Sequence, residues 1–186
     1  EVMVKIGILR NISARGKVRD VIEFVKDFRE NGKKIILFCS LHEVVDQLKR
    51  YFPTAVSVTG RDSLDEKQWA VDAFQNNPKA DIIICSIKVA GVGLTLTASS
   101  NVAFVEFPWT YADCCQCEDR AHRIGQKDSV TCYYFLGRRT IDEKVYRIIQ
   151  EKKNIANAVT GSTEDIEENI VDMVARIFNT DYDDEE

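Results

Sequence analysis

Residues 34–39 read KIILFC and residues 81–85 read DIIIC, and these two apolar runs decide the fold. Each run has the length of a β-strand and is rich in β-branched side chains. Three further runs share this character: AVSVT at 55–59, VAFVE at 102–106 and VTCYYFL at 130–136. Near-continuous apolar character, without strict alternation, is typical of strands that are covered on both faces, as in parallel sheets.

The segments between these runs predict helices, because capping-box pairs stand where an apolar run gives way to a helical period. A capping box joins a hydroxyl to an acid three residues later. The pairs are Ser40–Glu43, Ser63–Glu66, Thr110–Asp113, Thr140–Glu143 and Ser162–Asp165. Alternating strands and helices predict an α/β fold with a right-handed, doubly wound, mainly parallel sheet flanked by helices. The ligand sites of such folds lie at the carboxyl ends of the strands.

Beyond the last apolar run the sequence predicts a C-terminal helical extension. Apolar residues recur at helical spacing over 141–159, so we expect one amphipathic helix there and a second over about 165–178, after Gly161. The stretch after Phe178, NTDYDDEE, has little to bury and predicts disorder. The expected domains are a main lobe at 1–160, a C-terminal helix at 161–178 and an acidic tail at 179–186.

Charge is divided unevenly along the chain. The whole chain carries 25 basic and 30 acidic side chains, for a net charge of −5. Residues 164–186 hold ten of the acids and Arg176 as their one base, which is −9, so residues 1–163 carry +4. A mildly basic body is weak evidence for DNA binding, because phosphate contact depends on where cations cluster. No membrane partner is expected, since no apolar run approaches the roughly 20 residues that a spanning helix needs.

The six cysteines predict a reducing, intracellular setting. Cys39, Cys85 and Cys132 each lie inside an apolar, strand-like run, where cysteine serves as a small hydrophobe. The other three, at 114, 115 and 117, lack the C-x-x-C spacing and the downstream pair of zinc sites. We therefore expect a plain helix surface there and no metal site.

The strongest cluster of candidate functional residues runs from Gln116 to Gln126 and reads QCEDRAHRIGQ. We expect this cluster to lie in a helix capped by Thr110, on which Gln116, Arg120 and Arg123 project from one face. Two guanidiniums aimed in one direction repel each other unless they share an anionic target. One interpretation is a solvated charged face with the neighbouring acids as partners. The other is a phosphate clamp, because planar forks suit phosphate oxygens.

A second cluster, SIKVAGVGLTLT at 86–97, directly follows the run at 81–85. Glycines after a strand let a backbone approach a ligand closely, although a simple tight turn has the same signature. The next apolar run leads into EFPWT at 106–110, where Trp109 by itself indicates ordinary core packing.

The pattern Q-x-x-D-R-x-x-R-x-G-Q resembles motif VI of the SWI/SNF-type branch of superfamily-two helicases, which includes chromatin remodellers, annealing helicases and bacterial relatives. Other segments resemble further motifs of this family: residues 86–97, EFPWT at 106–110, KKIILFCS at 33–40, and TGRD at 59–62 followed by Phe74-Gln75. Tyr111 departs from the family pattern, in which proline usually stands there. The resemblance covers roughly residues 5–160 and implies the second, RecA-like lobe of a two-lobe motor.

The resemblance implies a role for each candidate residue. Arg120 and Arg123 become catalytic arginine fingers for ATP, held with Mg mainly by the first lobe, and neutralise charge on the transferred phosphoryl group. The implied contacts on the nucleotide side and at the lobe interface are Gln116, Gly91, Gly93, Asp119 and Gln126. The implied DNA contacts are Lys88, Trp109, Ser40, Gly60, Arg61 and Ser86. For Arg61, a surface pairing with Asp62 or Asp65 is equally open.

The function implied is the second ATPase lobe of an ATP-dependent DNA translocase or remodelling helicase, with double-stranded DNA and the N-terminal ATPase lobe of the same protein as partners. The sequence holds no G-x-x-x-x-G-K-[ST] phosphate loop, so this lobe alone is expected to be inactive. Two alternatives stay open: a non-hydrolysing nucleic-acid- or protein-binding module with a helicase-like fold, and an RNA-directed helicase lobe. The implied location is the nucleus in a eukaryote, and the cytoplasm or nucleoid in a bacterium.

Overall fold

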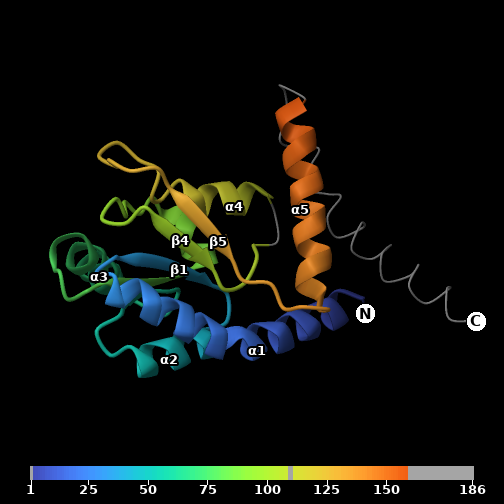
Figure 1. The fold of residues 1–186 in the computed structure, drawn as a ribbon, viewed down its shortest axis with the longest axis horizontal. Helices are drawn as coiled ribbons and strands as arrows, with labels where there is room; N and C mark the ends of the chain where they lie inside the picture. The colour runs from blue at the N-terminus through green and yellow to red at the C-terminus, as the bar shows by residue number, and fades with distance from the viewer. Residues whose placement is uncertain (1, 109–110, 159–186) are drawn as a thin grey trace, which may run out of the picture.

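A five-stranded sheet forms the centre of the molecule, and the computed structural model describes residues 2–108 and 111–158 (Figure 1). The strands are β1 Ile35–Cys39, β2 Val56–Val58, β3 Ile82–Ser86, β4 Asn101–Phe104 and β5 Thr131–Tyr134. Their order is β2-β3-β1-β4-β5, and every neighbouring pair is parallel. The five apolar runs therefore form the parallel sheet that the sequence predicts.

Helices cover both faces of this sheet, as a doubly wound fold requires. The helices are α1 Val2–Glu30, α2 His42–Tyr51, α3 Leu64–Asn76, the 3-10 helix η1 Ile87–Val92, α4 Tyr111–Glu118 and α5 Ile141–Ala158. Successive strand residues point to opposite faces. On β1, Leu37 packs in the core formed with α1 and α2, whereas Phe38 packs in the core formed with α3, η1 and α4.

Helix α5 lies outside these two layers and confirms the helix predicted at 141–159. Its apolar face packs with the first turns of α1 and with α4 in a third core cluster, in which Val145 and Ile148 meet Ile6, Phe107 and Cys114. The helix predicted at 165–178 and the acidic tail lie outside the described residues. Among the helices of 2–108 and 111–158, none is long and apolar enough to cross a bilayer.

Helix α1, with 29 residues the longest described helix, was not predicted. Its buried residues Ala14, Val18, Val21 and Val25 recur at intervals of three and four, which is the spacing of one helical face. The sequence signal was therefore present, but the charged residues between these positions dilute it.

The capping box at Ser63 is confirmed. Its hydroxyl accepts from Glu66 N at 3.3 Å, and its own N–H donates to the Glu66 carboxylate at 2.7 Å. At the start of α5, the Thr140 hydroxyl accepts from Asp142 N at 3.2 Å, one residue earlier than the predicted pairing with Glu143.

The capping box predicted at Ser40 is wrong. Helix α2 has Leu41 as its N-cap, and no side chain of its own caps it. The carboxylate of Glu106, at the end of β4, accepts instead from Ser40 N at 2.6 Å and from Leu41 N at 3.0 Å. An acid from a distant segment thus satisfies the free donors, while Glu43 pairs with Arg15 on α1 at 2.9 Å.

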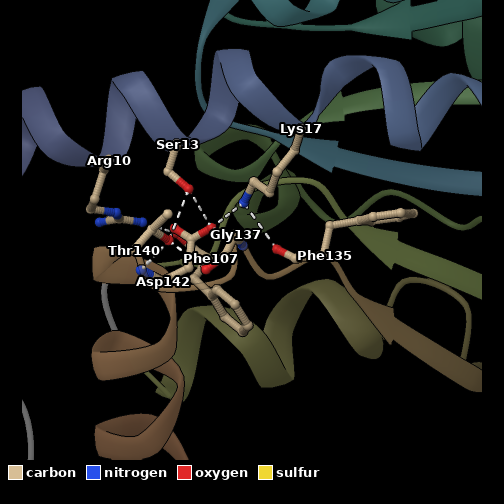
Figure 2. A network of polar contacts seen from close by, with 8 residues as sticks. All are labelled: Arg10, Ser13, Lys17, Phe107, Phe135, Gly137, Thr140 and Asp142. Atoms are coloured by element: carbon tan, nitrogen blue, oxygen red, sulfur yellow. Dashed lines mark hydrogen bonds and ion pairs between the residues drawn. The ribbon is translucent and has the colours of Figure 1, made fainter.

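A buried polar network joins α1 to the start of α5 (Figure 2). Asp142 Oδ2 accepts from Ser13 Oγ at 2.7 Å, Lys17 Nζ at 2.6 Å and Gly137 N at 3.0 Å. Lys17 also donates to the Phe135 carbonyl at 2.9 Å. The side chains of Lys17 and Asp142 are only 7% and 6% exposed, so the ion pair is shielded from water. This network fixes the direction in which the chain leaves β5 and enters α5.

Candidate functional site

Helix α4 ends at Glu118, so the prediction that Gln116, Arg120 and Arg123 share one helical face is wrong. The backbone N–H groups of residues 120 and 121 reach back three residues, at 3.1 Å each, which tightens the chain into a turn. In a continuing α-helix the Gln116 carbonyl would accept from Arg120 N. It accepts instead from Arg120 Nε at 2.9 Å, so the side chain of Arg120 takes the place of its own backbone donor.

The turn after α4 packs against the glycine-containing segment after η1. Arg123 Nη1 donates to the Gly93 carbonyl and to Thr95 Oγ1, both at 3.3 Å, and Leu96 N donates to the Arg120 carbonyl at 2.9 Å. Gly93 ends η1 in the left-handed conformation, with φ of +76°, which favours glycine. The segments at 86–97 and 116–126, which both resemble motifs of the same family, are therefore neighbours in the fold.

Arg120 is a buried cation with an unused donor. Its residue is 8% exposed, and within the described part of the chain its Nη1 atom has no hydrogen-bond partner. Burial lowers the pKa of its guanidinium, and the charge of Arg123 lowers it further, whereas Asp119 acts in the opposite direction. A buried donor without a partner is costly, so an anion placed beside it is stabilised strongly.

The other predicted nucleotide-side residues lie at the end of α4, in the turn after it and in the segment of η1, and those with a described exposure are mostly exposed. Gln116, Asp119 and Arg123 are exposed, and Gly91 lies within η1. Among the residues that the structure describes, the side chain of Arg123 makes two hydrogen bonds, both of 3.3 Å and both to the neighbouring segment. It can therefore move toward a ligand at little cost, whereas Arg120 is fixed in place.

Gln126 has a structural role that the sequence did not indicate. Its Nε2 donates to the Ser99 carbonyl at 2.9 Å, and its Oε1 accepts from Lys127 N at 3.0 Å and from Asp128 N at 3.2 Å. The amide thus ties the loop before β5 to the loop before β4. Its predicted contact with a nucleotide stays a prediction.

Five of the predicted DNA contacts share one edge of the sheet. Ser40 follows β1, Gly60 and Arg61 lie in the turn after β2, and Ser86 and Lys88 stand at the end of β3. These three strands are neighbours in the order β2-β3-β1, and all run parallel, so their carboxyl ends meet. Ser40, Gly60, Arg61 and Lys88 are exposed, while Ser86 is buried. Trp109 lies outside the described residues.

Arg61 pairs with Asp46 on α2, and not with either of the two acids that the sequence suggested. Its two terminal nitrogens donate to the two carboxylate oxygens at 3.1 and 2.6 Å. This bidentate contact raises the pKa of Arg61 and lowers that of Asp46. Both side chains are about half exposed, at 48% and 47%, so water weakens the pair and a phosphate can compete for the guanidinium.

Two residues that the sequence did not single out hold the loop between β4 and α4. Glu106, 7% exposed, ties this loop to the first residues after β1 through its carboxylate. Arg10 on α1 donates through Nη2 to the Phe107 carbonyl. Burial lowers the pKa of Arg10 to about 10, and the carboxylates of Glu106 and Asp142 limit this decrease. An acid at the end of the apolar run VAFVE was the available signal, because a buried charge needs a partner.

The cysteines of α4 correct the expected plain helix surface. Cys114 and Cys117 are 2% and 0% exposed and fill core clusters on either side of the helix. Burial raises the pKa of both thiols well above the ordinary value. In 2–108 and 111–158 no three His, Cys, Asp or Glu side chains are grouped to hold a metal ion.

Comparison with known proteins gives matches over the same region. Residues 16–125 match the family described as helicase conserved C-terminal domain. A SWI/SNF-related regulator of chromatin, subfamily A-like protein 1, from Xenopus tropicalis is 33% identical over 147 residues, 76% of this chain and 16% of that protein. The TATA-binding protein-associated factor MOT1 of Saccharomyces cerevisiae is 35% identical over 133 residues, 68% of this chain and 7% of that protein. An ATP-dependent helicase of Mycoplasma pneumoniae is 33% identical over 155 residues, 81% of this chain and 15% of that protein.

A solved structure has the same fold. The C-terminal part of the Fun30 ATPase domain superposes with a TM-score of 0.70 and 22% identity, over 89% of this chain and 53% of that one. The predicted RecA-like architecture is thereby confirmed. This chain spans no more than 16% of the three relatives compared by sequence, so each of them holds much that has no counterpart here.

Proposed function

Because the chain belongs to the helicase conserved C-terminal domain family and its relatives are of the SWI/SNF type, we propose that it is the second ATPase lobe of an ATP-dependent DNA translocase or remodelling helicase. In this role it supplies Arg120 and Arg123 to ATP and Mg²⁺ that are held mainly by a first lobe. Its exposed residues at the carboxyl ends of β1, β2 and β3 contact the DNA backbone.

One observation carries the nucleotide half of this proposal: the buried Nη1 atom of Arg120, which has no partner among the described residues. The positive charge of Arg123 lies close enough to lower the pKa of Arg120. The unpaired donor and the repulsion between the two cations both raise the free energy of this site. An oxygen of a terminal phosphate can lower it, because the oxygen accepts from Nη1 and its negative charge offsets the repulsion.

The different settings of the two arginines suggest different tasks. ATP with Mg²⁺ supplies the phosphoryl group that is transferred to water. Arg120, whose Nε is bonded to the Gln116 carbonyl, provides a positive charge that a phosphate reaches only when closure of the lobes uncovers the buried Nη1. Arg123, exposed and weakly held, can leave Gly93 and Thr95 and approach the phosphate when two lobes close. Closure would then depend on the nucleotide.

The DNA half of the proposal rests on the shared strand edge. Lys88 is exposed on η1 directly after β3, and the exposed backbone at Ser40 and Gly60 stands on either side of it. The Glu106 carboxylate accepts from Ser40 N and so fixes the segment after β1, and Asp46 pairs with Arg61 in the turn after β2. Phosphate oxygens accept well from cations such as Lys88 and Arg61 and from hydroxyls such as that of the exposed Ser40.

The test uses the protein that carries both lobes. Arg123→Ala is expected to lower DNA-stimulated ATP hydrolysis by about 10³-fold, as loss of an arginine finger commonly does. The free energy of unfolding should stay within about 0.5 kcal/mol of the wild type, because the side chain is exposed. Arg120→Ala should lower hydrolysis and also stability, since it removes the bond that ends α4.

The matched control is Arg50→Ala, an exposed arginine on α2, which should change neither quantity. Unchanged turnover in Arg123→Ala would reject the finger assignment. Stimulation by RNA as strong as by duplex DNA would favour the RNA-directed alternative. DNA binding without any nucleotide effect, in a protein that has no phosphate loop before residue 1, would favour the non-hydrolysing module.

A further inference from the structure

A groove of about 890 Å³ lies at the junction of α1 and α5, and none of its lining residues belongs to the arginine site or to the predicted DNA contacts. Its floor includes Leu9 and Ile12 on α1 and Leu136 after β5, which are 39%, 58% and 37% exposed. Five of its fifteen lining residues are lysine or arginine and two are acidic. The network of Figure 2 lies directly beneath it, since Ser13, Lys17, Gly137 and Thr140 contribute to both.

The surface chemistry of this groove selects one kind of ligand. Arg138, Arg139 and Arg147 are exposed, and all three line a groove that also presents the apolar side chains of Leu9, Ile12 and Leu136. Duplex DNA offers phosphates but little apolar surface to cover such a floor. An amphipathic helix with acids beside its apolar face satisfies both parts, because its apolar side covers the floor and its carboxylates meet the arginines.

The chain itself contains such a segment. Residues 165–178 read DIEENIVDMVARIF, and the apolar residues Ile166, Ile170, Val174 and Ile177 recur at helical spacing. Residues 164–186 carry a charge of −9, opposite in sign to the groove. These residues lie outside the described part of the chain, so the assignment rests on the groove and on the sequence.

The length of the connection allows the segment to reach the groove. Arg147 stands 11 residues before Ala158, the last residue of α5, which is about 16 Å along the helix axis. A reversal near Gly161, which favours a helix stop, would turn the chain back along α5. A helix over 165–178 is about 21 Å long, so it spans the distance back to Arg147 and to the groove beyond it.

We propose that residues 165–178 bind this groove within the same molecule, as an amphipathic helix that runs antiparallel to α5. The apolar face covers Leu9, Ile12 and Leu136, and the carboxylates pair with Arg138, Arg139 and Arg147. The groove is then an internal docking surface and not a nucleic-acid site.

Hydrogen exchange on the complete 186-residue chain tests the proposal. An isolated 14-residue helix is marginal in water, so strong protection requires packing. Amides of 166–178 are expected to exchange at least tenfold more slowly than in an unstructured peptide. In Arg138→Glu/Arg147→Glu the protection should fall below about threefold. Arg19→Glu/Arg50→Glu makes the same change in net charge at exposed sites outside the groove and should keep the protection.

Hydrogen exchange of the β1 and β3 amides shows whether the groove substitutions disturb the fold. If they do, a second variant that leaves the groove unchanged still tests the proposal. Glu168→Lys/Asp172→Lys changes only the segment and should abolish the same protection, and combining it with Arg138→Glu/Arg147→Glu should restore part of it. Three results would overturn the proposal: no protection of 166–178 in the wild type, protection that survives both pairs of substitutions, or protection that depends on protein concentration, which indicates a second copy. Weaker binding of a duplex by Arg138→Glu/Arg147→Glu with unchanged protection would show instead that the groove is a nucleic-acid surface.

Discussion

Asp142→Asn is predicted to lower the free energy of unfolding by about 3 kcal/mol, because it leaves the charge of Lys17 buried without its counter-charge. The carboxylate of Asp142 accepts three hydrogen bonds through one oxygen, from Ser13, Lys17 and Gly137 (Figure 2). The substitution keeps the size and shape of the side chain. The effect therefore measures charge and hydrogen bonding, and packing contributes little.

The burial of the pair sets the magnitude. Lys17 Nζ and Asp142 Oδ2 are 2.6 Å apart, and the two side chains are 7% and 6% exposed. Removing one partner of a buried pair costs about 3–5 kcal/mol. Asparagine retains an oxygen that can still accept from one of the three donors, and Lys17 keeps its bond to the Phe135 carbonyl, so the lower end of this range is expected.

Urea unfolding followed by circular dichroism measures the difference. With a slope of about 2 kcal/mol per molar urea, the midpoint should move by about 1.5 M. Glu43→Gln is the matched control, since its 2.9 Å pair with Arg15 joins the same helix α1 but is 51% to 53% exposed. Its loss should cost less than about 1 kcal/mol. Lys17→Met/Asp142→Leu should recover part of the stability, because a hydrophobic pair avoids the cost of burying charge.

Equal shifts of the urea midpoint in Asp142→Asn and Glu43→Gln would show that burial does not strengthen the Lys17–Asp142 pair. A double substitution that is less stable than Asp142→Asn alone would show the same. Either result would mean that water reaches the Lys17–Asp142 pair when the α1–α5 junction opens. The burial of the pair in the folded chain would then not determine its contribution to the free energy of unfolding.

Three further predictions concern the loops of the site. Glu106→Ala should lower the free energy of unfolding by about 1–3 kcal/mol, because it leaves Ser40 N and Leu41 N without an acceptor. Urea unfolding measures this loss, and Glu43→Ala is the control. Gly93→Ala should lower the free energy of unfolding by about 1 kcal/mol, because the backbone φ of +76° is unfavourable for alanine. Gly60→Ala should be nearly neutral in the same assay, since a Cβ has equal room there and the φ is not positive. Lys88→Ala should lower the slope of log affinity for duplex DNA against log salt by about one, and Lys33→Ala, before β1 at the opposite edge of the sheet, should leave it unchanged. An equal slope for both lysine variants would contradict the DNA contact.

The sheet could be predicted from the sequence because its signal is local. Each strand is a run of mainly apolar residues, and β1 and β3 are buried on both faces throughout, so no long-range information is needed to recognise them. The Ser63 capping box is equally local, since its two hydrogen bonds join residues three apart. The same holds for α5, whose apolar face repeats within its own length.

The caps and pairs that failed depend on residues far away in the chain. Nothing near Ser40 indicates that Glu106, 66 residues later, will accept from its backbone. Arg61 likewise had two acids within four residues, yet it pairs with Asp46 on a neighbouring helix. Local patterns give the candidates for a polar contact, but the packing of helices on the sheet decides among them.

The end of α4 shows how one side chain changes the meaning of a motif. The spacing of Gln116, Arg120 and Arg123 suits a helix, and a helix would give both arginines the same exposure. The helix instead ends at Glu118, the Gln116 carbonyl accepts from Arg120 Nε, and the Arg120 residue is 8% exposed. Arg123 then falls beyond the turn and remains exposed beside Gly93. The two arginines of this segment therefore differ in burial, which a shared helical face does not predict.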